Sequence, residues 1–439
     1  MKILSFFLAV LVFVLPVVVN AEEIIKKGEV LNVERCVEIG LKMHPSIYAA
    51  RGNVEAFNAR KGQAESEYYP QVDASLGYRR YQPTTNTSGT GGVLGSTPTT
   101  HSFWQYATDV IASQTIFDFW RTMTQVSIAK LNIDSAKADL MSTEDQVIFS
   151  VKQAYYALLN AKRNLEVAGD TVTQFKEHLD QAKAFYEVGT KPKFDVTNAE
   201  VDLGNAQLNL IRAENSFKVA KVTLNNTLGV PDAPEYEIED NLSFVKYSIG
   251  LQEAISRAYE NRSELKSIAF QKKAAEESVR FAKTGYFPVL TGNASYSWVG
   301  HRFRDGDGWS TGLTLSIPVF NGFLTKSQVS EARANLSIVA ANEEVLRQNV
   351  LLEVQQMYQN LIDLEAGIPI AELTVRQAQE NVEIANGRYA AGVGNPIEVT
   401  DANTGLSNAR TTLNQVLSNY KIARASLEKA MGVRYDREK

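Results

Sequence analysis

The chain has very few residues of the kinds that form disulfides, metal centres or nucleophilic sites. Among its 439 residues there are one cysteine, Cys36, and four histidines. One cysteine cannot form an intramolecular disulfide framework. The histidines are His44, His101, His178 and His301; they fall in unrelated segments without the spacing of metal ligands, and no phosphate-binding loop is present. We therefore expect no enzyme activity, no cofactor and no metal site.

Charge and hydrophobicity exclude two further classes. The 45 lysines and arginines stand against 50 aspartates and glutamates, for a net charge of −5, and they form no basic stripe. Nucleic acid is therefore not an expected partner. Beyond the first residues, no apolar run reaches the about 20 residues that a membrane-spanning helix needs. If the mature chain crosses a membrane, it must do so as a β-barrel.

The one long apolar run lies at the N-terminus. It extends from Ile3 to Val19, directly after Lys2, and small residues follow up to Ala21. This pattern predicts a secretory signal peptide over residues 1–21 that is removed after Ala21. The competing interpretation is a retained membrane anchor, but the run is at the short limit for a spanning helix, about 20 residues.

The clearest pattern is an internal duplication. Tyr186-Glu187-Val188-Gly189 aligns with Tyr389-Ala390-Ala391-Gly392, which lies 203 residues later, and the offset holds without a gap to the end of each copy. Upstream the offset is 218, because Tyr69-Pro70 aligns with Phe287-Pro288, so the first copy carries an insertion of 15 residues. Two copies of one unit make up the chain. The predicted domains are the signal peptide at 1–21, a first repeat at 22–230, a linker at 231–248 and a second repeat at 249–439.

Each copy contains long helices with a narrow apolar seam. From Leu203 to Leu224, and again from Leu406 to Leu427, apolar residues step by three and four on an otherwise polar helix, as in coiled coils. The stretch before each seam could form a single helix of about 105 Å at 1.5 Å per residue. Pro369 predicts a kink in the second of these. The predicted helices are 32–68, 119–188 and 195–228 in the first repeat, and 249–286, 322–391 and 398–431 in the second.

Between the helices the apolar period becomes two. Leu290, Ala294 and Trp298 lie on one side of an alternating pattern with polar residues on the other, and the first copy has a weaker form of the same pattern. Segments of about 10 residues with one apolar face are typical of the wall of a membrane β-barrel. The predicted strands are 71–81, 103–116, 288–299 and 309–319.

Aromatic residues gather at the ends of these strands, as two interfacial belts would require. Soluble hairpins are the alternative, but they would need a core to cover their apolar face, and the thin helical seams offer little for that purpose. The residues at one end are Tyr68, Tyr69, Phe117, Tyr286, Phe287 and Phe320, and those at the other end are Trp104, Trp298 and Trp309.

In each copy, one loop joins the two predicted strands. The loop at 83–100 is rich in threonine and glycine and has no charged residue, and whether it forms a receptor site or is merely tolerated is left open. The loop at 301–308 contains Asp305-Gly306-Asp307-Gly308. This stretch begins like a calcium-binding loop but lacks the downstream glutamate, so we interpret it as a turn.

The four strands cannot close a barrel by themselves. Open sheet edges in lipid leave backbone groups unpaired, at a cost of several kcal/mol each. An interior formed by about 8 strands is filled with side chains, so two chains would form a plug and three chains would form a pore of about 12 strands. Several chains must therefore share one barrel, and the expected fold class is an internally duplicated α+β membrane protein.

This twofold order of helix, strand, strand, long helix, turn and return helix resembles the TolC family of outer-membrane efflux and export channels. Each turn reads Tyr-x-x-Gly and is followed by an acidic residue and valine, at Asp195-Val196 and Glu398-Val399. The resemblance covers nearly the whole mature chain. It implies a homotrimer, in which a trimeric β-barrel with four strands per chain lies in the lipid of the outer membrane and continues into a long α-helical coiled-coil barrel in the periplasm.

The resemblance also implies a function. Such a trimer is the exit duct of a tripartite efflux pump or of a type I secretion system, and molecules pass through it passively. Its partners are a periplasmic adaptor (membrane fusion) protein, which docks at the helical tips, and an inner-membrane transporter. Drugs, metals and secreted proteins all use such ducts, and the sequence does not distinguish between these cargoes.

In that family a gate closes the periplasmic end through contacts among a tyrosine, a basic residue and aspartates near the tips. The matching positions are Asp195, Tyr389, Glu398 and Asp401. Threefold symmetry would turn each carboxylate into a ring of like charges that favours cations. The alternative is that Asp195 and Glu398 only cap the return helices.

The gate departs from the family pattern at one position. Where family members can carry an arginine, this chain has Gly394. Either the gate is held more weakly here, or Lys191 or Lys193 on the other turn supplies the cation. Gly189 and Gly392 are interpreted as turn residues that need a positive φ, at the place where family adaptors make contact.

Overall fold

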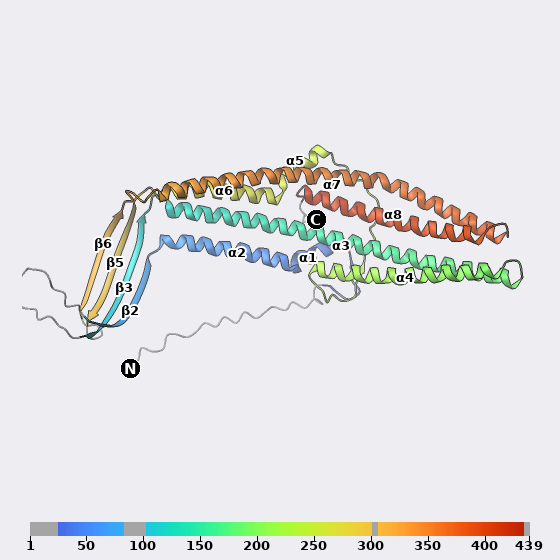
Figure 1. The fold of residues 1–439 in the computed structure, drawn as a ribbon, viewed down its shortest axis with the longest axis horizontal. Coiled ribbons are helices and arrows are strands. Elements are labelled where there is room, and N and C mark those ends of the chain that lie inside the picture. The colour runs from blue at the N-terminus through green and yellow to red at the C-terminus, as the bar shows by residue number, and fades with distance from the viewer. Residues whose placement is uncertain (1–24, 83–101, 301–305, 434–439) are drawn as a thin grey trace, which may run out of the picture. The chain divides into compact units, whose positions relative to one another are not determined.

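The computed structural model describes residues 25–82, 102–300 and 306–433. The predicted signal peptide, the loop at 83–100, the first part of the 301–308 loop and the C-terminal end of the second repeat lie outside these residues. Within the three described ranges, no helix has both the length and the apolar character to span a membrane. The described elements, in chain order, are β1 (Val30–Leu31), α1 (Val33–Met43), α2 (Pro45–Glu65), the short 3₁₀ helix η2 (Ser66–Tyr68), β2 (Gln71–Tyr81), β3 (Phe103–Phe117), α3 (Arg121–Glu187), α4 (Lys193–Leu228), β4 (Glu237–Ile238), α5 (Leu251–Asn261), α6 (Ser263–Thr284), β5 (Val289–Gly300), β6 (Asp307–Ser316), α7 (Leu324–Ala390) and α8 (Pro396–Ala430) (Figure 1).

The chain folds into two compact units, and each unit draws on both repeats. Of the described residues, the first contains 25–48, Thr143–Asn261 and 350–433. The second contains Ala49–Ser142 and Arg262–Asn349. The repeats at 22–230 and 249–439 are therefore repeats of sequence and are not separate compact bodies. The segment at 231–248 lies inside the first unit and does not separate two domains.

The second unit contains an antiparallel sheet of four strands in the order β2-β3-β5-β6. Its register places Leu76 opposite Thr108, Val110 opposite Tyr296, and Tyr296 opposite Trp309. Because side chains alternate along a strand, one face carries most of the apolar residues of the four strands, whereas Ile111 and Val299 lie on the opposite face. The opposite face carries Asp73, Asp109, Ser295 and other polar residues. Many side chains of the apolar face are exposed, among them Val72, Leu76, Tyr78, Trp104, Trp309, Leu313 and Leu315.

The junctions between strand and long helix have an unusual backbone. Phe119 and Trp120 both have positive φ, at 52° and 64°. Gly322 and Phe323 take the equivalent places in the second copy, with φ of 64° and 66°. Left-handed backbone cannot continue an α-helix of L-residues, so α3 begins at Arg121 and α7 at Leu324, each two residues later than predicted. The Asp118 carboxylate accepts from the backbone N–H of Thr122 at 2.7 Å, which caps the start of α3.

In the first unit the return helices pack along the ends of the long helices. Figure 1 shows α4 running back along α3 and α8 running back along α7. The predicted seam is buried in α8 at Leu406, Tyr420 and Leu427, whereas in α4 full burial is confined to Ala206 and Leu224 among the seam residues. α7 continues as one helix past Pro369. The same apolar pattern is thus covered to different degrees in the two copies.

A buried tyrosine ties the middle of α3 to the linker. Tyr155 is fully buried, and its hydroxyl lies 2.7 Å from the Glu239 carbonyl oxygen and 3.3 Å from that of Leu31. These acceptors flank the short parallel pair β1–β4. Burial raises the pKa of Tyr155 above its ordinary value, so the hydroxyl stays a neutral donor.

Tyr155→Phe should lower the free energy of unfolding by about 0.5–1.5 kcal/mol, because it removes the hydrogen bonds that this buried hydroxyl donates to the carbonyl groups of Glu239 and Leu31. Thermal unfolding in detergent, followed by near-ultraviolet circular dichroism, measures the loss, and limited proteolysis should cut the 231–248 segment faster. The control is Tyr358→Phe at the matching position of the second copy, which is only half-buried. Equal losses for the two substitutions would contradict this role of Tyr155.

Candidate functional site at the two helical turns

The turns that follow α3 and α7 have the same backbone form. Gly189 N–H donates to the Tyr186 carbonyl at 2.9 Å, and Gly392 N–H donates to the Tyr389 carbonyl at 3.0 Å. The two glycines have φ of 76° and 77°, which confirms the predicted positive sign. A β-carbon would meet no atom within 4 Å at either glycine, so the backbone conformation alone requires glycine here.

The helices after these turns begin earlier than predicted, at Lys193 and Pro396 instead of 195 and 398. The side chain of Asn395 accepts from the Ile397 N–H at 3.0 Å and caps α8, whereas Pro192, which precedes α4, offers no side-chain cap. Asp195 and Glu398 therefore lie inside the first turns of α4 and α8 and do not cap them. Their carboxylates are still favoured there by the helix dipole.

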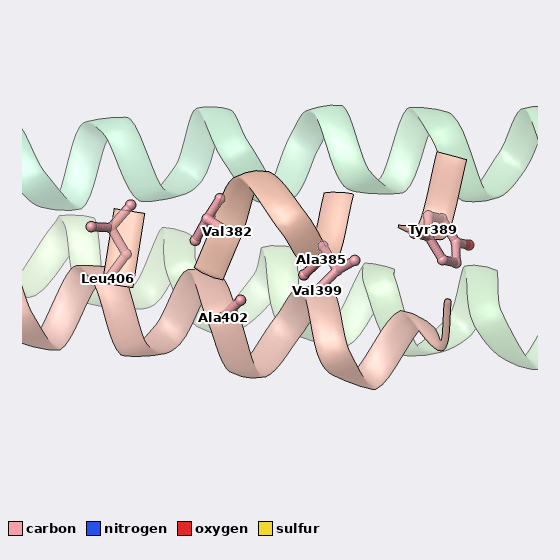
Figure 2. Packing of buried hydrophobic residues seen from close by; sticks show 6 residues of the cluster. All are labelled: Val382, Ala385, Tyr389, Val399, Ala402 and Leu406. Carbon is pink, nitrogen blue, oxygen red and sulfur yellow. The ribbon is translucent and has the colours of Figure 1, made fainter. Parts of the chain in front are cut away.

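Tyr389 is the most buried of the predicted gate residues. Its exposed fraction is 0%, and it belongs to a cluster of buried residues on α7 and α8 that also contains Val399 and Leu406. Figure 2 shows this cluster as a row of side chains with Tyr389 at one end. From α3, the ring of Phe185 lies 5.6 Å from the Tyr389 ring in an edge-on arrangement, and the ring of His178 lies 5.1 Å away.

Of the two predicted lysines, Lys191 reaches Tyr389. Its ammonium lies 5.3 Å from the centre of the Tyr389 ring, which is within cation–π range, and donates to the Gly394 carbonyl at 3.3 Å. Lys193 is exposed. At Gly394 a β-carbon would lie 2.7 Å from the Tyr389 backbone nitrogen, so this turn has no room for the side chain that family members can carry.

An ion pair that the sequence did not reveal lies beside this contact. Arg388 Nε lies 3.2 Å from Glu398 Oε2, and both side chains are about half exposed. Asp401, a turn further along α8, is exposed. Asp195, by contrast, is 5% exposed. Its charge adds to burial in raising the pKa of Tyr389, with burial the larger cause.

A second polar contact joins the return helices. Thr400 on α8 donates to the Asp202 carboxylate on α4 at 2.7 Å. A cavity of about 160 Å³ lies beside this pair and is also lined by His178 and Asn198. Within the described ranges, no group of three His, Cys, Asp or Glu residues is placed to hold a metal ion.

The structure thus brings Tyr389, Lys191 and Asp195 into one buried region and leaves Glu398, Asp401 and Lys193 at its surface. Sequence reasoning missed Phe185, His178 and Arg388. The seven-residue spacing of His178 and Phe185 on α3 is the spacing of one helical face, and this could have indicated the first two. Arg388 directly precedes Tyr389 and lies ten residues before Glu398, across the turn.

Comparison with known proteins gives consistent matches over most of the chain. The outer membrane efflux protein family matches residues 38–230 and 254–433. The outer membrane protein TolC of Escherichia coli K12 is 25% identical over 341 residues, which cover 73% of this chain and 68% of TolC. The probable efflux pump outer membrane protein TtgC of Pseudomonas putida is 22% identical over 411 residues, which cover 91% of this chain and 82% of TtgC.

A solved structure shows the same fold. The outer membrane protein VceC of Vibrio cholerae superposes with a TM-score of 0.76 at 19% identity, and the match covers 91% of this chain and 96% of VceC. The predicted resemblance is therefore confirmed, and it includes both turns. The chain belongs to the outer membrane efflux protein family and has the fold of the TolC-like channels.

Proposed function

We propose that three copies of this chain form a trimeric duct, in which the four-stranded sheets close one β-barrel of about 12 strands and the long helices continue it as a coiled-coil tube. The duct is the outer-membrane exit of a tripartite efflux pump. An adaptor protein docks at the helical turns and links it to an inner-membrane transporter, which supplies the energy. The exposed apolar face of the sheet is the observation that carries this proposal.

The sheet supports a shared barrel in two ways. Its apolar face is exposed across all four strands, which a water-soluble hairpin pair would have to cover. Its outer strands, β2 and β6, each pair on one side with a strand of the same sheet. Neighbouring copies would pair with the other edges and leave no backbone group open to lipid.

The helices support the same assembly. α4 exposes a stripe of apolar residues, and helices in water normally bury such a stripe against a partner. α7 exposes a second stripe. Packing of one copy against the next would cover both. The exposed residues are Val201, Leu208, Ile211, Val219 and Val222 on α4, and Ile338, Val345, Leu352, Ile370 and Ile384 on α7.

In the proposed duct, the packed turns are the closed state of the gate. Tyr389 and the helix that carries it would have to leave Phe185, His178 and Lys191 before α7 and α8 could move away from α3 and α4. Gly189 and Gly392 shape the turns at which the adaptor makes contact. Charge at the entrance then comes from the exposed carboxylates, and Asp401 is the main one because Arg388 offsets Glu398.

The assembly is tested by native mass spectrometry of the detergent-purified protein, followed by single-channel recording in planar bilayers. We expect a mass of three chains, and openings that are small because the turns are packed. A monomer that remains in solution without detergent would overturn the duct, and would leave a soluble coiled-coil protein in its place.

Tyr389→Ala should open the gate. Removing a buried aromatic side chain costs about 3 kcal/mol or more, and that loss falls on the closed state, so the open-to-closed ratio should rise on the order of a hundredfold. Single-channel recording measures the larger conductance. The matched control is Tyr186→Ala, at the same place in the first copy, where the tyrosine is 47% exposed. Equal effects of the two substitutions would exclude a special role for Tyr389.

Ion selectivity should depend on Asp401 more than on Glu398. Asp401→Asn removes a ring of charge that has no described ion-pair partner, so we expect cation selectivity to fall clearly. Glu398→Gln should have a smaller effect, because Arg388 already offsets this charge. Reversal potentials in a salt gradient give both values. A larger change for Glu398→Gln would show that the ion pair breaks in the assembled duct.

A further inference from the structure

We propose that His178 is a positioning residue of the gate and makes its closure depend on pH: the neutral imidazole holds Tyr389 in the closed arrangement, and protonation releases it. This inference rests on the proposed duct. It adds a histidine on α3 to the predicted gate, which consists of a tyrosine, lysines and carboxylates.

His178 lies directly against Tyr389 in the structure. The His178 ring lies 5.1 Å from the Tyr389 ring with 59° between the two planes, and the residue is 4% exposed. Its Nδ1 atom is buried without a hydrogen-bond partner among the described residues. The Tyr389 hydroxyl is likewise buried without one. The two tilted rings therefore contact each other without a hydrogen bond from either of these two atoms, which suits an uncharged imidazole.

The charged groups around His178 come from several elements. α4 contributes Asp195 and Asp202, of which Asp202 already accepts from Thr400 on α8. α7 contributes Tyr389, whose raised pKa keeps it neutral. The ammonium of Lys191 lies against the same tyrosine ring. An imidazolium would thus share the ring with a second cation, at a place with little water.

Burial is the dominant influence on this histidine. It lowers the pKa of His178 below the ordinary value of 6.5, and the two aspartates act in the opposite direction without overcoming it. When the turns separate, water can reach the ring and the pKa returns towards its ordinary value. A proton therefore binds the open form more tightly than the closed form.

The direction of the pH effect follows from linkage. Because the closed-state pKa is the lower one, closure is fully stabilised above the ordinary value of 6.5 and weakens as the pH falls through it towards the closed-state pKa. Each unit of difference between the two pKa values changes the open-to-closed ratio by up to about tenfold. The neighbouring cavity of about 160 Å³, lined by His178 and Asp202, lies where the first additional water could enter.

The test compares single-channel recordings at about pH 7.5 and about pH 5.5, a range that spans the ordinary histidine titration. The wild type should open more often at the lower pH, by up to about tenfold for each unit of pKa difference. His178→Gln, which cannot take up a proton in this range, should lose the response. The matched control is His44→Gln on the α1–α2 connection, which should keep it.

A second measurement does not depend on ion flow. Hydrogen exchange of the peptides covering 178–200 and 385–403, corrected for the intrinsic effect of pH, should show faster exchange at the lower pH in the wild type and in His44→Gln, and no change in His178→Gln. Channels whose pH response survives in His178→Gln would overturn the role of His178 and leave the duct intact. A wild type without any pH response in openings or exchange would overturn it as well. If no channels form and the exchange shows no pH response, both proposals fail.

Discussion

A seam of apolar residues only about one side chain wide limits how much surface each helix can bury within a single chain. The consequences appear throughout the first unit. The Tyr155 hydroxyl contacts the carbonyl groups of Glu239 in the linker and of Leu31 in β1. Arg163 pairs with Asp240 through two nitrogen–oxygen contacts of 2.7 and 2.8 Å, and the Tyr420 hydroxyl donates to the Val245 carbonyl at 2.9 Å. These polar and aromatic contacts supplement a thin core. The apolar stripes on α4 and α7 remain exposed in one chain, and in the proposed trimer the neighbouring copies would cover them.

Duplication fixes the backbone of the two turns but leaves their side chains free to differ. Tyr389 is fully buried, whereas its counterpart Tyr186 is 47% exposed. Lys191 corresponds to Gly394, and the lysine of the first turn donates to the carbonyl of that glycine in the second. The two turns thus contact each other through residues that differ between the copies. Tyr155 is likewise fully buried, whereas its counterpart Tyr358 is only half-buried.

Periodicity in the sequence predicts the long helices and the strands of the four-stranded sheet, because a seam of period 3.5 and a strand of period two are long and regular here. It does not predict the two-residue strands β1 and β4. β2 covers the predicted range of 71–81, and β3 extends one residue beyond its predicted end. The predicted starts of α3 and α7 are two residues too early. For α3 the reason is that nothing in Phe119-Trp120 indicates a left-handed backbone, which bulky residues rarely adopt. A gate role for Tyr389 is predicted from the family resemblance, through the Tyr-x-x-Gly motif of the turn. His178, which lies against the Tyr389 ring, and Arg388, which pairs with Glu398, are not predicted, since the sequence alone does not show which side chains meet near the turns.

The expected energies of these contacts indicate that different residues of the proposed gate hold it closed and select ions. The Arg388–Glu398 pair is about half exposed, and such pairs contribute about 0–1 kcal/mol, less at high salt. Each ring contact of a buried aromatic is worth about 0.5–1.5 kcal/mol beyond the burial of its surface, and Tyr389 has two such ring neighbours. Closure would therefore be held mainly by the buried ring, while the exposed charges would set which ions approach. Since the ring lies against a histidine, the proposed pH dependence would act on the strength of closure.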